Sequence, residues 1–117
     1  MNNKGKLAEL KASQYLISKN YRIVECNYST RFGEIDIIAV KDKVIAFIEV
    51  KMRDENRIAL PREFVNKSKQ QKIIASSKIY LAHHKTQLQP RFDIIEVYTE
   101  NNKIKSIEHL ENAFQVV

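Results

Sequence analysis

Apolar residues recur along the chain at two periods, one typical of helices and one typical of strands. In residues 7–18 they gather on one side of a helix with about 100° between successive residues, as Ala8, Ala12, Tyr15 and Leu16. A second helix is predicted over residues 68–84, with Ser68–Gln71 as its capping box. Its inner stripe contains Ile73, Ser77, Tyr80 and Leu81. Each helix therefore has one face suited to covering a sheet.

Stretches rich in β-branched residues predict five strands, at residues 21–28, 34–40, 44–51, 92–98 and 104–110. Residues 53–61, which include Arg57, are polar and irregular, and we expect a mobile loop there. The element order is α-β-β-β-α-β-β, which predicts an α/β fold with a central mixed sheet of about five strands flanked by helices. Because 117 residues suffice for one hydrophobic core, residues 1–117 are expected to form a single domain.

The apolar runs and the cysteine content indicate the cellular setting. No apolar run approaches the length that a bilayer requires, and the polar Met1–Lys4 start is not followed by the apolar stretch of a signal peptide. We therefore expect a cytoplasmic protein that does not cross a membrane. The single cysteine, Cys26, has no partner for an internal disulfide and no metal-ligand spacing, so we interpret it as a packing residue in a strand.

The excess positive charge lies in one segment. The formal net charge is +6, and residues 61–91 contain seven basic residues and one acidic residue, whereas the rest of the chain contains 13 of each. Basic surfaces that neutralise phosphates release counterions and so favour binding, and this segment is typical of a polyanion-binding surface. An ordinary solvated helix face explains the same charges about as well.

Two carboxylates interrupt the strands that are predicted to be most buried. Asp36 stands among isoleucines, and Glu49 stands between Ile48 and Val50. An unpaired buried carboxylate costs on the order of several kcal/mol or takes up a proton, so both residues need partners. In a hairpin with an even-numbered loop, such as Asp42–Lys43, position 36 is opposite position 49 and the two side chains share a face.

Lys51 would share that face, because it lies two residues beyond Glu49 in the same strand. An odd-numbered loop would divide the three side chains between two faces, so the sequence leaves both registers open. Opposed carboxylates suit a hard divalent cation, and Mg²⁺ or Mn²⁺ is the expected cofactor. Such an ion activates water and polarises phosphate, while Lys51 would stabilise charge on the phosphoryl oxygens. The alternative is a surface ion pair, because Glu-x-Lys is common on strands.

Four motifs that together span nearly the whole chain resemble those of the bacterial YraN family. They are Gly5 with Glu9 in the first helix, Gly33–Ala39 (GEIDIIA), Phe47–Arg53 (FIEVKMR) and Arg91–Ile95 (RFDII). The YraN family is similar in turn to archaeal Holliday junction resolvases, which belong to the PD-(D/E)xK superfamily. The proline of the PD motif is absent here, since Ile35 precedes the aspartate.

This resemblance implies a restriction-endonuclease-like core and a set of catalytic residues. It implies that Asp36 and Glu49 are the metal ligands and that Lys51 is the catalytic lysine. It also implies that Glu9 is a further catalytic acid on the first helix. Fold-level similarity supports a fold more strongly than it supports an activity.

Our hypothesis from the sequence is a metal-dependent endonuclease that acts on structured or branched DNA. Lys67, Lys69, Lys72 and Arg53 are predicted to contact the DNA backbone. Symmetric cutting of a junction requires two active sites, so the resolvase resemblance implies a homodimer. Two other classes fit the same sequence: a nuclease-fold protein that binds nucleic acid without cutting it, and a scaffold protein whose basic helix binds an acidic partner.

Overall fold

The computed structural model describes residues 3–54 and 65–116 of the chain. Its elements are α1 Asn3–Ser18, β1 Arg22–Thr30, β2 Gly33–Lys41, β3 Val44–Asp54, α2 Lys67–His83, β4 Gln89–Glu100 and β5 Lys103–Phe114. The predicted α/β class and the order α-β-β-β-α-β-β are confirmed. The loop predicted from residue 53 begins later, because β3 continues to Asp54. The rest of that loop, residues 55–61 with Arg57, lies outside the described residues.

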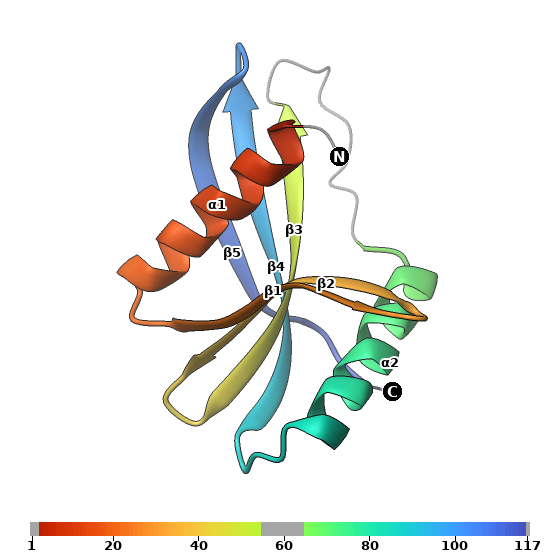
Figure 1. The fold of residues 1–117 in the computed structure, drawn as a ribbon. Coiled ribbons are helices and arrows are strands. Elements are labelled where there is room, and N and C mark those ends of the chain that lie inside the picture. Colours follow the sequence, from red (N-terminus) through yellow and green to blue (C-terminus); the bar gives the residue numbers. More distant parts are fainter. Residues whose placement is uncertain (1–2, 55–64, 117) are drawn as a thin grey trace.

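The five strands form one mixed sheet in the order β1-β2-β3-β4-β5. β3 and β4 are parallel, with α2 in the connection between them, and the other neighbours are antiparallel. α1 crosses one face of the sheet and α2 lies on the other (Figure 1), so the chain builds a helix–sheet–helix arrangement. This arrangement is compatible with a restriction-endonuclease-like core.

Each helix buries the stripe that its sequence pattern predicts. On one face, Ala8, Ala12 and Leu16 of α1 are buried against the sheet, and the small alanines let the helix approach it closely. On the other face, Ile73 and Tyr80 of α2 pack with apolar residues of β2, β3 and β4. The central strands are covered on both sides, which explains their nearly continuous apolar sequence.

Two local predictions are wrong. The cap of α2 is Asn66 and not Ser68: the Asn66 side chain accepts a hydrogen bond from the Lys69 amide at 2.8 Å, so the helix begins at Lys67. Cys26 is exposed and does not pack in the core. It lies in the edge strand β1, where a bulge after Ile23 and the left-handed backbone of Asn27 interrupt the alternation of buried and exposed positions.

Neither helix is long and apolar enough to cross a bilayer in the part of the chain that the structure describes.

Candidate metal centre

The register of the β2–β3 hairpin decides where the two strand carboxylates lie. The strands are joined by the two-residue turn Asp42–Lys43, in which Asp42 adopts a left-handed φ of 53°. Lys41 pairs with Val44, and the pairing continues to Ile37 opposite Ile48. Position 36 is therefore in register with position 49, as an even-numbered loop requires.

Asp36 lies where β2 separates from β3. Ile37 and Ile48 are the last paired residues of the two strands, and beyond them β2 curves away from the rest of the sheet (Figure 1). At this point the amide of Val50 donates a hydrogen bond to Asp36 Oδ2 at 2.8 Å. The carboxylate thus takes the place of a backbone acceptor, which fixes its position at the edge of the opening between the strands.

Glu49 is buried without full hydrogen bonding. The residue is 5% exposed, and its Oε2 has no hydrogen-bond partner within the described residues. Its Oε1 lies 3.4 Å from the Nζ of Lys69 in the first turn of α2. A buried carboxylate oxygen without a partner is costly, and such an atom calls for a ligand or another functional explanation.

The two strand carboxylates act on each other. Burial, followed by the negative charge of Glu49, raises the pKa of Asp36 from 3.8 to about 7, against the hydrogen bond from the Val50 amide, which lowers it. Glu9 raises the same pKa further through its charge. A carboxyl group with this pKa is half protonated near neutral pH, and a bound cation would keep it ionised.

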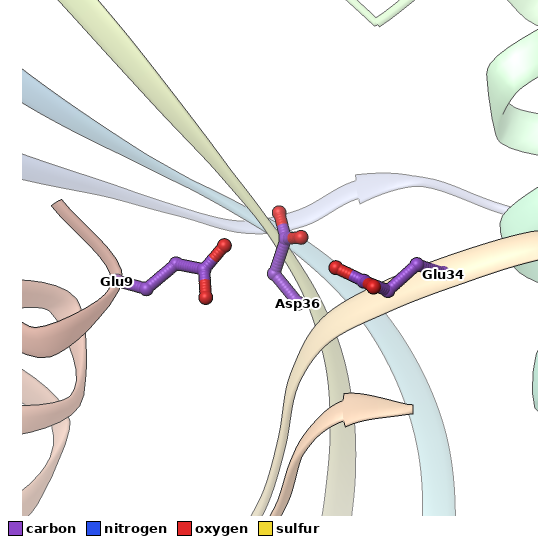
Figure 2. Close-up of side chains that lie close together, drawn as sticks. All are labelled: Glu9, Glu34 and Asp36. Atoms are coloured by element: carbon purple, nitrogen blue, oxygen red, sulfur yellow. The ribbon is translucent and has the colours of Figure 1, made fainter. Parts of the chain in front are cut away.

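Glu9 and Glu34 bring two further carboxylates to Asp36. Oxygen atoms of Glu9, Glu34 and Asp36 all lie within 4.8 Å of one another. Figure 2 shows Glu9 reaching from α1 and Glu34 from β2, with their carboxylates directed toward Asp36 from opposite sides. Helix α1 thus supplies an acid from one side of the sheet to a cluster built on β2.

Asn27 of β1 holds the two outer carboxylates in place. Its Nδ2 donates to Glu9 Oε1 at 2.9 Å and to Glu34 Oε1 at 3.0 Å. The left-handed backbone of Asn27, with a φ of 53°, is a conformation that asparagine tolerates better than most residues. Sequence patterns alone do not identify Asn27 or Glu34 as site residues, although Glu34 shares with Asp36 the two-residue spacing that places side chains on one face.

Two other buried carboxylates of the sheet have hydrogen-bond partners on both oxygens, whereas Glu49 has a partner on Oε1 alone. Asp93 in β4 accepts two hydrogen bonds from Arg91, at 2.8 Å each, one from His109 at 2.8 Å and one from the Asn112 amide at 3.0 Å. The RFDII motif, which contains Asp93, therefore has a structural role. Glu96, also in β4, receives hydrogen bonds from other side chains as well.

The remaining predicted site residues lie on or near the α2 face of the sheet. Lys51 is half-buried, two positions beyond Glu49 on β3, and Lys67 and Lys72 are exposed on α2. Lys69 pairs with Glu49, and its side chain is partly exposed. Arg53 donates from Nε to Glu96 Oε2 at 3.0 Å, so its guanidinium is partly engaged inside the protein.

An Asp36→Asn variant is expected to be more stable than the parent protein at pH 8 without added metal, by about 1 to 3 kcal/mol. The folded-state pKa of about 7 exceeds the ordinary value of 3.8. The parent therefore loses stability as the pH rises from 4 through 7, and the full cost is present above pH 7. The amide removes this cost and still offers Val50 an acceptor. Urea unfolding at pH 5 and pH 8 measures both effects, and equal or lower stability of the variant at pH 8 would contradict this electrostatic assignment.

The chain is similar to known proteins over most of its length. The model of a family described as uncharacterised protein family UPF0102 matches residues 8–97. A UPF0102 protein of Alkaliphilus oremlandii is 46% identical over 97% of this chain and 100% of its own length. A UPF0102 protein of Caldanaerobacter subterraneus is 44% identical over 94% of this chain and 93% of its own, and one of Clostridium botulinum is 43% identical over 95% and 93%.

Proposed function

This chain belongs to the uncharacterised protein family UPF0102, and we propose that it is a divalent-cation-dependent nuclease that hydrolyses phosphodiester bonds in structured DNA. One observation carries the proposal: Glu49 is buried beside Asp36 with an oxygen that no described group satisfies. Asp93, a carboxylate equally buried in the next strand, has a complete set of donors. Both oxygens of Asp93 therefore have partners, whereas Glu49 has Lys69 on Oε1 and no hydrogen-bond partner on Oε2 among the described residues.

The residues present fit a hard divalent cation. Among the described residues, carboxylate oxygens of Glu9, Glu34 and Asp36 lie together, and oxygens are the atoms that Mg²⁺ and Mn²⁺ prefer. Glu49 is not one of these three, but its negative charge acts on Asp36. Asp36 and Glu49 would hold the ion, and Glu9 would provide a further acid from α1. Such an ion would polarise a phosphate and lower the pKa of a water molecule.

The chain's own groups would orient the substrate and stabilise its charge. The Val50 amide fixes Asp36, and Asn27 fixes Glu9, so neither carboxylate must reorganise when DNA arrives. Lys51, on the strand that carries Glu49, would place its ammonium against the phosphoryl oxygens as negative charge develops on them. The exposed Lys67 and Lys72 would bind neighbouring backbone phosphates.

DNA is the favoured polymer because the motifs of this chain resemble those of the YraN family and, through it, junction resolvases. That resemblance also supports branched DNA as the substrate and a homodimer as the cutting unit. Action in the cytoplasm is part of the proposal as well, and it follows from the sequence pattern and not from the resemblance. A physical argument also supports a polyanionic substrate. The lysines of α2 lie near the carboxylates, and their positive charge offsets the repulsion between those carboxylates and the phosphates.

Incubation with labelled DNA tests the proposal. Purified protein is mixed with Mg²⁺ or Mn²⁺ and with duplex, single-stranded, flap or four-way-junction DNA, beside an Asp36→Ala/Glu49→Ala double variant. We expect cation-dependent cleavage of the branched substrates by the parent protein only. If the parent binds these DNAs but cuts none of them over a wide range of protein concentrations, the protein is a nuclease-fold binding protein instead.

A Lys51→Met variant is expected to cleave about 100-fold more slowly than the parent, because a preorganised positive charge in a partly buried site contributes about 2–4 kcal/mol to the transition state. Its affinity for Mn²⁺ should stay within about threefold, since the carboxylates are unchanged. Single-turnover cleavage and isothermal titration give the two quantities. Lys43→Met, in the exposed β2–β3 turn, is the matched control and should cleave at the parental rate. Equal rates for both variants would remove Lys51 from the mechanism.

A further inference from the structure

Lys69 is placed differently from the other lysines of α2. Its Nζ lies 3.4 Å from Glu49 Oε1, and its side chain is 45% exposed while that of Glu49 is 6% exposed. Its backbone amide donates a hydrogen bond to the capping side chain of Asn66, and this bond fixes the start of the helix beside β3. Lys67 and Lys72 lie on the same helix with exposed side chains, and no ion pair with the acidic cluster is found for them among the described residues.

The ammonium of Lys69 partly neutralises the carboxylates of the proposed metal centre. Asp36 and Glu49 are close enough for each charge to affect the other, and Glu9 adds a third negative charge nearby. A cation on Glu49 Oε1 lessens this repulsion and leaves Oε2 unsatisfied. A divalent ion on the same carboxylate would sit only a few ångströms from the ammonium, and the two positive charges would repel each other.

We propose that Lys69 is the internal counter-ion of these carboxylates when no divalent cation is bound. When a divalent cation binds, the Lys69 ammonium leaves Glu49 and contacts a phosphate of the bound DNA. The partial exposure of its side chain allows this movement without unfolding, because the long stem reaches solvent. The proposal rests on the proposed function. The additional claim is that Lys69 forms an ion pair within the protein before the metal binds and contacts the substrate afterwards.

Two consequences distinguish this role from that of an ordinary surface lysine. Removing the Lys69 charge should strengthen metal binding, since the competing cation is gone. Lys69 should also contribute a phosphate contact only after the metal has bound, whereas Lys72 should contribute with or without it.

Titration with Mn²⁺ alone tests the first consequence. We expect Lys69→Met to bind Mn²⁺ about three- to tenfold more tightly than the parent, and Lys72→Met to change the affinity by less than about twofold, because Lys72 is not paired with Glu49. Lys69→Arg, which keeps the charge, should bind no more tightly than the parent. Circular dichroism checks that each variant is folded, and Lys69→Gln replaces the methionine variant if it is not.

The salt dependence of binding to a four-way junction tests the second consequence. Each phosphate contact contributes about 0.9 to the slope of log K against log salt. Without metal, Lys69→Met should keep the parental slope and Lys72→Met should lose about 0.9. With Ca²⁺ present as an oxygen-seeking divalent cation, both variants should lose about 0.9.

The outcomes separate the two proposals. If the parent binds Mn²⁺ and Lys69→Met binds it equally or more weakly, the counter-ion role is wrong and the proposed function stands. The role is also wrong if Lys69→Met loses the same slope with and without Ca²⁺. If no variant binds Mn²⁺, both the metal centre and the counter-ion role fail. Binding by Lys69→Met but not by the parent is the strongest support for the role.

Discussion

Replacing Glu49 by glutamine is expected to reduce cation-dependent DNA cleavage by about 10³-fold or more without lowering the stability of the protein. The loss follows because a ligand carboxylate supplies several kcal/mol to charge stabilisation, and each 1.4 kcal/mol corresponds to a factor of ten in rate. Stability should be kept, because the substitution removes the like charge beside Asp36 and conserves the shape of a buried side chain. Cleavage under single-turnover conditions and urea unfolding measure the two effects.

Glu108→Gln is the matched control for this substitution. Glu108 is exposed on the edge strand β5, which β3 and β4 separate from β2, and its amide variant should cleave at the parental rate. If Glu49→Gln retained a tenth or more of the parental activity, Glu49 would not be a ligand of the reacting metal. If it instead unfolded the protein, Glu49 would be a structural residue like Asp93.

Replacing Asp93 by asparagine is expected to lower the free energy of unfolding by about 3 to 5 kcal/mol. Asp93 is fully buried and holds Arg91 and His109, and Arg91 in turn donates to the Tyr21 hydroxyl at 2.6 Å. The variant leaves this largely buried guanidinium with only its longer ion pair to the exposed Glu111, at 3.4 Å. A loss of this size is a large part of the 5–15 kcal/mol that typically holds such a domain folded.

The pH dependence of this effect follows from the pKa of Asp93. Burial alone would raise that pKa, but the hydrogen bonds from His109, Arg91 and the Asn112 amide lower it below 3.8. The ion pair therefore stabilises the fold fully above pH 4 and is lost as the pH falls below that value. Urea unfolding at pH 7 and pH 3 should show the gap between parent and variant closing at the lower pH.

Asp42→Asn provides the control for Asp93→Asn. Asp42 is exposed in the β2–β3 turn and has a positive φ that asparagine adopts readily, so its variant should stay within about 0.5 kcal/mol of the parent. A change below 1 kcal/mol for Asp93→Asn would contradict a structural role for the RFDII motif and would make Asp93 a candidate site residue.

The sequence predicts the sheet and helices of this protein because their patterns are local. The apolar stripe of α1 and the β-branched runs of β2 and β3 determine which faces are buried, and the two-residue turn at Asp42–Lys43 then puts position 36 in register with 49. The sequence pattern could not choose this register alone, because the Asp-Lys turn lacks the usual glycine. The left-handed φ of Asp42 supplies what glycine would have supplied.

The features that the sequence does not predict depend on where distant elements meet. Glu34 and Asn27 join the cluster only because β1 and α1 approach β2 at the place where β2 leaves β3. The contact between Lys69 and Glu49 depends on the start of α2, which a cap at Ser68 rather than Asn66 would have changed. The exposure of Cys26 results from the irregular edge strand. The spacing of apolar residues within one helix or strand does not indicate which distant elements will meet.

Anomalous diffraction from crystals grown with Mn²⁺ tests the central claim most directly. The proposed metal centre predicts an anomalous peak within about 2.2 Å of an oxygen of both Asp36 and Glu49, with Glu49 Oε2 now paired. Such a peak, absent from Glu49→Gln crystals, would establish the cation site on which the nuclease proposal depends. A map with no peak at these carboxylates at saturating Mn²⁺, or with Mn²⁺ bound only elsewhere, would contradict it.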